Sequence, residues 1–185
     1  MTSPTAPPVR EMTFADVERV SEIRVRGWQR AYRGLMPQSY LDALSVAEDA
    51  ERRRASFGQG GPGVVNLVAE RAGAVVGWAA LGPYRDGEVL TPDAELYALY
   101  AAVEHLGTGV GRALLEEAAR RAEALGHPVM RLWVLRDNVP ARRFYARAGL
   151  HADGAEEPFE VAGVAVPEVC HGGRLPLKAS FHAVS

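Results

Sequence analysis

The sequence has one cysteine, no long apolar run and almost no net charge. A lone cysteine, Cys170, cannot form an internal disulfide. No segment approaches the roughly 18 consecutive apolar residues of a membrane span, and residues 1–10 lack the apolar core of a secretory signal. A net charge of −2 at pH 7 argues against non-specific electrostatic binding of nucleic acid. These absences predict a cytoplasmic protein that binds neither nucleic acid nor a membrane.

The composition is that of an ordinary globular protein, with 48% hydrophobic and 24% charged residues in a chain of 185. That length suits a single domain. Residues 1–10 hold three prolines and little that could be buried, so we expect a flexible N-terminal arm there. Residues 11–185 are then expected to form the one folded domain.

Hydrophobic periodicity and turn residues divide the chain into a helical front and a β-rich remainder. Helices are expected from Phe14 to Leu35, after Pro37 and from Ser45. The expected strands are 64–70, 74–81, 95–101, 129–135, 150–161 and 166–177, with helices over 110–125 and 138–148 and a polar loop over 85–92. A strand–helix–strand unit inside a meandering sheet predicts a mixed α/β sheet.

A glycine-rich turn between an apolar strand and a helix carries the strongest chemical signal. Gly107, Gly109 and Gly111 follow the strand, and the helix begins at once. Glycines allow a positive φ and a close approach of the backbone to a ligand. A helix N-terminus presents unpaired N–H groups and partial positive charge, and Arg112 can add a formal charge. The turn therefore suits phosphate or pyrophosphate, although the same glycines can serve only a tight turn.

Two nucleotide-binding motifs do not account for this turn. The dinucleotide fingerprint requires Gly-x-Gly-x-x-Gly, whereas the spacing here is Gly-x-Gly-x-Gly. The nucleotide P-loop is excluded because no Gly-Lys-Ser/Thr follows. The turn therefore serves either a different kind of phosphate-bearing ligand or only the tight connection from strand to helix.

The segment from Glu95 to Leu115 resembles the acyl-CoA-binding motif of the GCN5-related N-acetyltransferase (GNAT) superfamily. Gly109 and Gly111 fall on the motif glycines. The segment departs from the motif at Leu106, where Arg or Gln is usual, and at Thr108, where a second basic residue is common. Because backbone N–H groups do most of the pyrophosphate binding, these departures are expected to weaken the site without abolishing it.

The segment from 132 to 150 resembles the next motif of the same superfamily. The matching residues are Asn138, Ala141, Phe144, Tyr145 and Gly149. Two ordered motifs, separated by one helix and one strand, are far more specific than either motif alone. Together they cover about 55 residues, and the flanking elements occur in a compatible order.

The resemblance implies a fold and an activity. The fold is α/β (α+β), a single-domain GNAT acyl-CoA N-acyltransferase fold with a mixed, mostly antiparallel sheet of six or seven strands. Helices flank this sheet, which is splayed at strands 4 and 5. The activity is transfer of acetyl from acetyl-CoA to a primary amine of a small molecule or protein. It proceeds by direct attack in a ternary complex, with no acyl-enzyme and no metal. The alternatives are a CoA-binding regulatory module without turnover and transfer of a different acyl group.

The resemblance also assigns residues to the acetyl-CoA site. Tyr145 would be the general acid that protonates the leaving thiolate, and Asn138 would hydrogen-bond the pantetheine arm or only cap its helix. The residues aligned with the acetyl-CoA site are Leu99, Tyr100, Ala101, Gly107, Thr108, Gly109, Val110, Gly111, Arg112, Asn138 and Tyr145.

The acceptor side is less defined by the sequence. Glu95 matches a glutamate that serves as general base in the histone-acetylating branch, although it can equally lie at the exposed entrance of its strand. Trp28, Tyr32 and Tyr84 are the candidate acceptor-binding residues. The spacing of Trp28 and Tyr32 also suits one buried helix face. The resemblance leaves a homodimer open, because members of the superfamily often pair through sheet edges or C-terminal strands.

Overall fold

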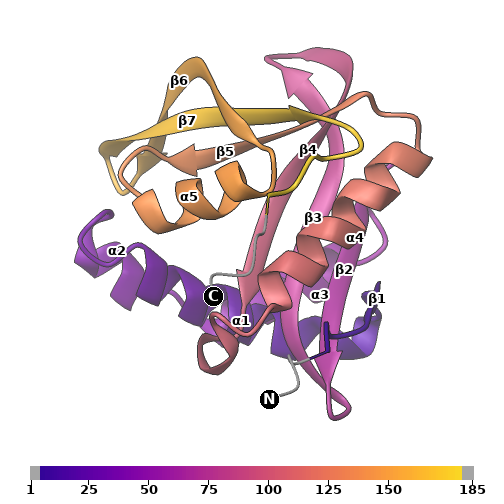
Figure 1. Cartoon of the computed structure of the whole chain (residues 1–185). Coiled ribbons are helices and arrows are strands. Elements are labelled where there is room, and N and C mark those ends of the chain that lie inside the picture. Colours follow the sequence, from indigo (N-terminus) through magenta and orange to yellow (C-terminus); the bar gives the residue numbers. More distant parts are fainter. Residues whose placement is uncertain (1–4, 181–185) are drawn as a thin grey trace.

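The computed structural model describes residues 5–180, which form one mixed sheet covered by helices (Figure 1). The strands are β1 (Val9–Glu11), β2 (Val65–Arg71), β3 (Ala74–Asp86), β4 (Val89–Ala101), β5 (Val129–Leu135), β6 (His151–Val161) and β7 (Val164–Arg174). The helices are α1 (Val17–Ala31), α2 (Gln38–Asp42), α3 (Val46–Ser56), α4 (Val110–Ala124) and α5 (Val139–Arg147), with short 3-10 turns at Phe14–Asp16 and Val103–His105.

Seven strands of the described chain make up the sheet, in the order β1-β2-β3-β4-β5-β7-β6. Neighbouring strands are antiparallel except β4 and β5, which are parallel because α4 crosses over between them. The predicted mostly antiparallel sheet with one parallel pair is confirmed.

Two helices cover opposite faces of the sheet. Leu114 and its neighbours on α4 pack with Leu67 of β2 in the main core cluster. Ile23 of α1 packs with Val68 and Trp78 in a second cluster. Leu67 and Val68 are adjacent, and successive side chains in a strand point to opposite faces. The sheet is therefore covered on both faces at β2 and β3. Within residues 5–180, no helix combines the length and apolarity needed to cross a membrane.

The helix starts follow their sequence signals. The Ser45 side chain accepts a hydrogen bond from the Glu48 backbone N–H at 3.3 Å, which caps α3 as the sequence predicts. Asn138 caps α5 in the same way, with its side-chain oxygen 3.4 Å from the Ala141 N–H. Each cap satisfies a backbone donor that the first turn of a helix leaves unpaired.

Two expectations about irregular segments are wrong. The flexible arm was expected to extend through residue 10, but Val9 and Arg10 lie in β1 and pair with Ala69 and Val68 of β2. Residues 1–4 lie outside the described part of the chain. The polar loop expected over 85–92 is instead a hairpin, in which β3 and β4 extend toward each other and turn at Gly87. The sequence pattern did not reveal β1 or the extended ends of β3 and β4, because these segments carry polar side chains. Cross-strand backbone hydrogen bonds form regardless of side-chain hydrophobicity.

Replacing Gly77 by alanine should destabilise the fold by about 1–3 kcal/mol, the usual cost of overpacking a core. A Cβ at this position on β3 would lie 2.5 Å from Val110 Cγ1 and 2.8 Å from Leu114 Cδ1, so α4 must shift away from the sheet. Urea unfolding measures the loss. Gly172→Ala on β7 is the matched control, because its nearest neighbour would be Arg131 at an ordinary 3.6 Å. Equal stability of the two variants would contradict the prediction.

Candidate active site

The two central strands separate after two residue pairs. β4 and β5 join Ala94 to Met130 and Glu95 to Arg131. Both strands continue beyond these pairs, and over the described chain no further pairing joins them. Their facing backbone N–H and C=O groups therefore lack a strand partner, and an extended ligand can supply one. The sheet is splayed where the sequence predicts.

A β-bulge in β4 lies at the start of the gap. Between Ala80 and Leu81, β3 advances by one residue while the paired residues of β4 go from Ala98 to Leu96, which leaves Tyr97 as the extra residue. The Tyr97 hydroxyl donates to the Pro83 carbonyl at 2.6 Å and holds the ring against β3. Bulges bend a strand and increase its twist, so this one helps β4 diverge from β5.

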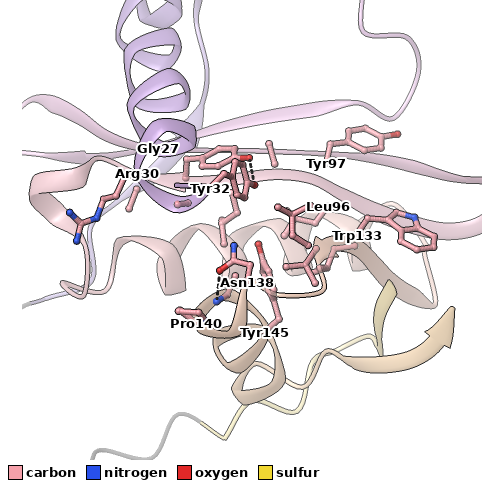
Figure 2. Close-up of a pocket in the computed structure, with 18 of the residues that line it drawn as sticks. Gly27, Arg30, Tyr32, Leu96, Tyr97, Trp133, Asn138, Pro140 and Tyr145 are labelled. Atoms are coloured by element: carbon pink, nitrogen blue, oxygen red, sulfur yellow. Dashed lines mark hydrogen bonds between the residues drawn. The ribbon is translucent and has the colours of Figure 1, made fainter. Parts of the chain in front are cut away.

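The gap opens into a cavity of about 280 Å³. Figure 2 shows its lining, which comes from α1, β4, β5, α5 and β7. The lining residues are Gly27, Arg30, Ala31, Tyr32, Leu96–Ala101, Val103, Leu106, Leu132–Leu135, Asn138, Pro140, Ala141, Tyr145 and Glu168.

Tyr145 lies in the wall of this cavity, on α5. Its hydroxyl points into the space beside the Asn138 side chain (Figure 2). Burial raises the pKa of Tyr145 above the ordinary value of 10.0 for a phenol, with a further contribution from Tyr100. The hydroxyl is therefore protonated at neutral pH and able to donate a proton.

Asn138 has two roles in the structure that the sequence left as alternatives. Its oxygen accepts from the Ala141 N–H and caps α5, while the residue also lines the cavity. Figure 2 shows the amide at the cavity wall. An amide whose oxygen is engaged still has two N–H donors, so capping and ligand binding are compatible.

The glycine turn lies between the 3-10 turn after β4 and the first turn of α4. Gly107 and Gly109 have φ of 73° and 89°, in the left-handed region that favours glycine. No atom lies within 4 Å of a Cβ placed on either residue, so the outer side of the turn is open. Thr108 makes two hydrogen bonds that stabilise the turn. Its hydroxyl donates to the His105 carbonyl at 2.7 Å, and its own carbonyl accepts from the Arg71 guanidinium at 2.6 Å.

The first turn of α4 presents its backbone rather than its side chains. Val110 is buried in the core, and a Cβ on Gly111 would contact the Phe144 ring at 3.6 Å. The Arg112 side chain pairs with Glu116 one turn along the same helix, at 2.7 Å. The first N–H groups of a helix have no intrahelical acceptor. Such groups can bind an anion.

Leu99, Tyr100 and Ala101 all lie along the cavity on the free edge of β4. Tyr100 stacks on Trp78 with ring centroids 6.1 Å apart, and its hydroxyl lies 3.2 Å from that of Tyr32 on α1. These contacts fix the Tyr100 side chain between Trp78 and Tyr32. The backbone groups of the three residues are the parts that the sequence assigned to the ligand.

The structure places the three predicted acceptor residues in different surroundings. Tyr32 lines the cavity. Trp28 packs behind it, with ring centroids 5.0 Å apart, in a cluster that joins α1 and α2 to β7. Tyr84 lies on β3 in a separate groove, with the Arg131 guanidinium 5.6 Å from its ring centroid.

Glu95 lines that separate groove rather than the cavity. Trp133 of β5 lines both spaces and so stands between them. Burial, followed by the charges of Glu157 and Glu168, raises the pKa of Glu95 from 4.5 to about 7. The carboxyl is thus suited to accept a proton near neutral pH, but from the groove.

Sequence reasoning missed Glu168, a residue of β7 that lines the cavity. It lies opposite Leu135 on β5 and opposite Glu157 on β6. Burial first, and Glu157 second, raise the pKa of Glu168 from 4.5 to about 7. No motif marks it, because only the pairing of β7 with β5 brings a residue so late in the chain to the cavity.

Two other kinds of catalytic group that an enzyme can use are a thiolate and a metal centre. Cys170 is buried, and burial raises the pKa of its thiol to about 12, so it does not supply a thiolate at neutral pH. Among residues 5–180, no three or more His, Cys, Asp or Glu side chains are grouped to hold a metal ion.

Comparison with known proteins decides the family. A model of the acetyltransferase (GNAT) family matches residues 25–150, from within α1 to the end of the second motif. The chain belongs to the acetyltransferase (GNAT) family. Its GNAT relatives include a probable N-acetyltransferase of Mycobacterium tuberculosis, 28% identical over 87% of this chain and 90% of that one. A spermidine N(1)-acetyltransferase of Thermoplasma acidophilum is 22% identical over 80% of this chain and 90% of that one.

Solved structures share the GNAT fold. A GCN5-related N-acetyltransferase of Rhodopseudomonas palustris superposes with a TM-score of 0.74 at 21% identity, covering 95% of this chain and 99% of that one. An N-acetyltransferase of Thermoplasma acidophilum in complex with coenzyme A gives a TM-score of 0.68 at 20% identity, covering 92% and 99%. This GNAT protein is an acyltransferase of the N-acetyltransferase type.

The residues present fit a CoA thioester. The open, positive-φ turn at Gly107 and Gly109 leaves room for a pyrophosphate against the first N–H groups of α4. The unpaired edge of β4 can bond a pantetheine arm, which carries two amides. Tyr145 lines the cavity that this edge of β4 also lines. Leu106 also lines this cavity. It therefore presents an apolar side chain where the motif usually has arginine or glutamine.

Proposed function

We propose that this GNAT protein transfers acetyl from acetyl-CoA to a primary amine of a small molecule or protein, by direct attack in a ternary complex. The observation that carries the proposal is the Tyr145 hydroxyl pointing into the cavity, which the unpaired backbone of Leu99–Ala101 also lines. A binding module without turnover has no need of a buried, protonated phenol at this point.

The two ends of the donor are held by different parts of the chain. The turn at Gly107–Gly109 and the N-terminus of α4 bind the pyrophosphate, while Leu99–Ala101 and the Asn138 amide bind the pantetheine arm. Backbone N–H groups of β4 polarise the thioester carbonyl. Holding amine and thioester in one site supplies much of the rate acceleration.

The chemistry itself requires one proton donor and one proton acceptor. Tyr145 donates to the leaving thiolate, since its raised pKa keeps the phenol protonated. The resemblance assigns the acceptor role to Glu95, whose carboxyl titrates near pH 7. Cys170 takes no part, because its thiol stays protonated. Tyr32 and Tyr84 border the two spaces from which an amine can approach.

Acetyl-CoA should bind in the micromolar range by calorimetry, and CoA should be released when an amine is added. Three amines span the acceptor classes: spermidine, tyramine and a peptide with an N-terminal alanine. We expect saturable release of CoA with at least one of them, detected as free thiol. Binding without release from any amine would favour the regulatory module. Faster release from a longer acyl-CoA than from acetyl-CoA would favour a different acyl donor.

A further inference from the structure

We propose that Glu168, rather than Glu95, removes the proton from the acceptor amine. The inference rests on the proposed acetyl transfer and names a further catalytic residue for it. Among the described residues that line the cavity, Glu168 is the one carboxylate, and it shares that cavity with Tyr145. Glu95 faces the neighbouring groove on the far side of Trp133.

Strand alternation fixes the face on which Glu168 lies. Val166, two residues earlier on β7, packs in the cluster that contains Trp28 and Tyr32 of α1. Side chains two residues apart in a strand point the same way, so Glu168 also faces the side covered by α1 and α2. Tyr145 enters from α5 and packs against the main core cluster, which includes α4. The two groups therefore flank the gap between β4 and β5 from different elements.

This arrangement separates the two substrates. The glycine turn and the start of α4 lie with Tyr145, on the side where the donor binds. Glu168 lies with Tyr32, on the side left for the acceptor. A proton acceptor on the acceptor side and a proton donor beside the leaving thiolate are the positions that the reaction requires.

The charged and titratable groups around Glu168 favour proton transfer near neutral pH. Glu157 on β6 lies directly opposite it, and like charges at such a pair disfavour ionisation. Tyr32 on α1 and Tyr100 on β4 both have their pKa raised in part by the Glu168 charge, and Glu95 on β4 is affected in the same way. β5 contributes only Leu135 at this point.

The proton balance of the step is complete. Glu168 takes one proton from the ammonium group, and the neutral nitrogen attacks the thioester carbonyl carbon. The C–N bond forms and the C–S bond breaks. The sulfur takes the phenol proton of Tyr145, and the second proton leaving the nitrogen returns to that phenolate. Glu168 then releases its proton to water, so one amide, one thiol and one proton are produced.

The test compares Glu168→Gln, Glu95→Gln and Glu157→Gln in the full chain, with Glu160→Gln on the exposed side of β6 as the matched control. Turnover is followed as free thiol with spermidine, tyramine and the alanine peptide, and acetyl-CoA affinity is measured by calorimetry. We expect Glu168→Gln to lower kcat by about 100-fold, within the usual range for general base catalysis, with acetyl-CoA affinity unchanged.

The pH profile gives a readout that a structural role would not move. In the wild type kcat/KM should rise with pH through about 7, because the base must be ionised. In Glu168→Gln this rise of kcat/KM with pH, the acidic limb of the profile, should be absent. Glu157→Gln should shift the limb to lower pH, because the like charge opposite Glu168 is removed.

Three outcomes would overturn the proposal. If kcat/KM of Glu168→Gln still rises with pH through about 7, Glu168 does not take part in the proton transfer. A limb that disappears in Glu95→Gln instead makes Glu95 the base. A wild type that binds acetyl-CoA but releases no CoA with any of the three amines defeats the proposed transfer and the base together, and so differs from a failure of the base alone.

Discussion

Acetyl-CoA binding should be lost when Gly109 is replaced by glutamate. Gly109 caps α4 with φ 89°, and the space around its Cα is open toward the proposed pyrophosphate site. A glutamate places a carboxylate where two phosphates must sit, and any side chain there is strained. We expect an affinity loss of at least about 100-fold, or about 2.8 kcal/mol, measured by calorimetry.

Gly126→Glu is the matched control for this substitution. Gly126 follows α4 at its other end, with φ 87° and the same open surroundings. Both variants carry the same strain and the same added charge, but the helix dipole favours a carboxylate at the start of α4 and disfavours one at its end. Gly126→Glu should therefore lose at least as much stability in urea unfolding as Gly109→Glu. Only the change at position 109 should affect the ligand. If Gly109→Glu folds and still binds acetyl-CoA like the wild type, the pyrophosphate site lies elsewhere.

Replacing Tyr145 by phenylalanine should lower kcat by about 100- to 1,000-fold, since general acid catalysis contributes on this scale. The ring would keep its packing against Phe144, whose centroid lies 5.3 Å away, and only the hydroxyl in the cavity would be removed. Acetyl-CoA affinity should stay within about twofold. Thiol release with the most active of the three amines gives kcat, and calorimetry gives the affinity.

Tyr40→Phe is the control for the loss of a phenol. Tyr40 packs against Trp28 with centroids 6.4 Å apart and does not line the cavity. Its kcat should equal that of the wild type. A Tyr145→Phe variant with wild-type kcat would show that the thiolate leaves without help from this residue, and the proton donor would have to be water.

The glycine turn and the capped start of α5 could be predicted because their causes are local. A left-handed residue before a helix needs glycine, which Gly107 and Gly109 provide. A side-chain oxygen that caps a helix reaches three residues ahead, as Asn138 does to Ala141. Each of these features depends on residues that are neighbours in the chain.

The hairpin over 85–92 and strand β1 escaped prediction because their stability comes from other strands. Arg85 pairs with Leu90, and Val9 with Ala69, through backbone bonds that no side-chain pattern announces. The extended ends of β3 and β4 form part of the second groove. Tyr84 and Glu95 line this groove and not the main cavity.

Two contiguous motifs were enough to indicate the family, the glycine turn before α4 and the phenol at position 145. Tertiary structure alone decided which carboxylate shares a cavity with the phenol. Glu95 lines a different groove from Tyr145, whereas Glu168 reaches the cavity because β7 pairs with β5. The reason is physical: strand pairing joins residues by register, and register depends on the whole sheet rather than on local sequence.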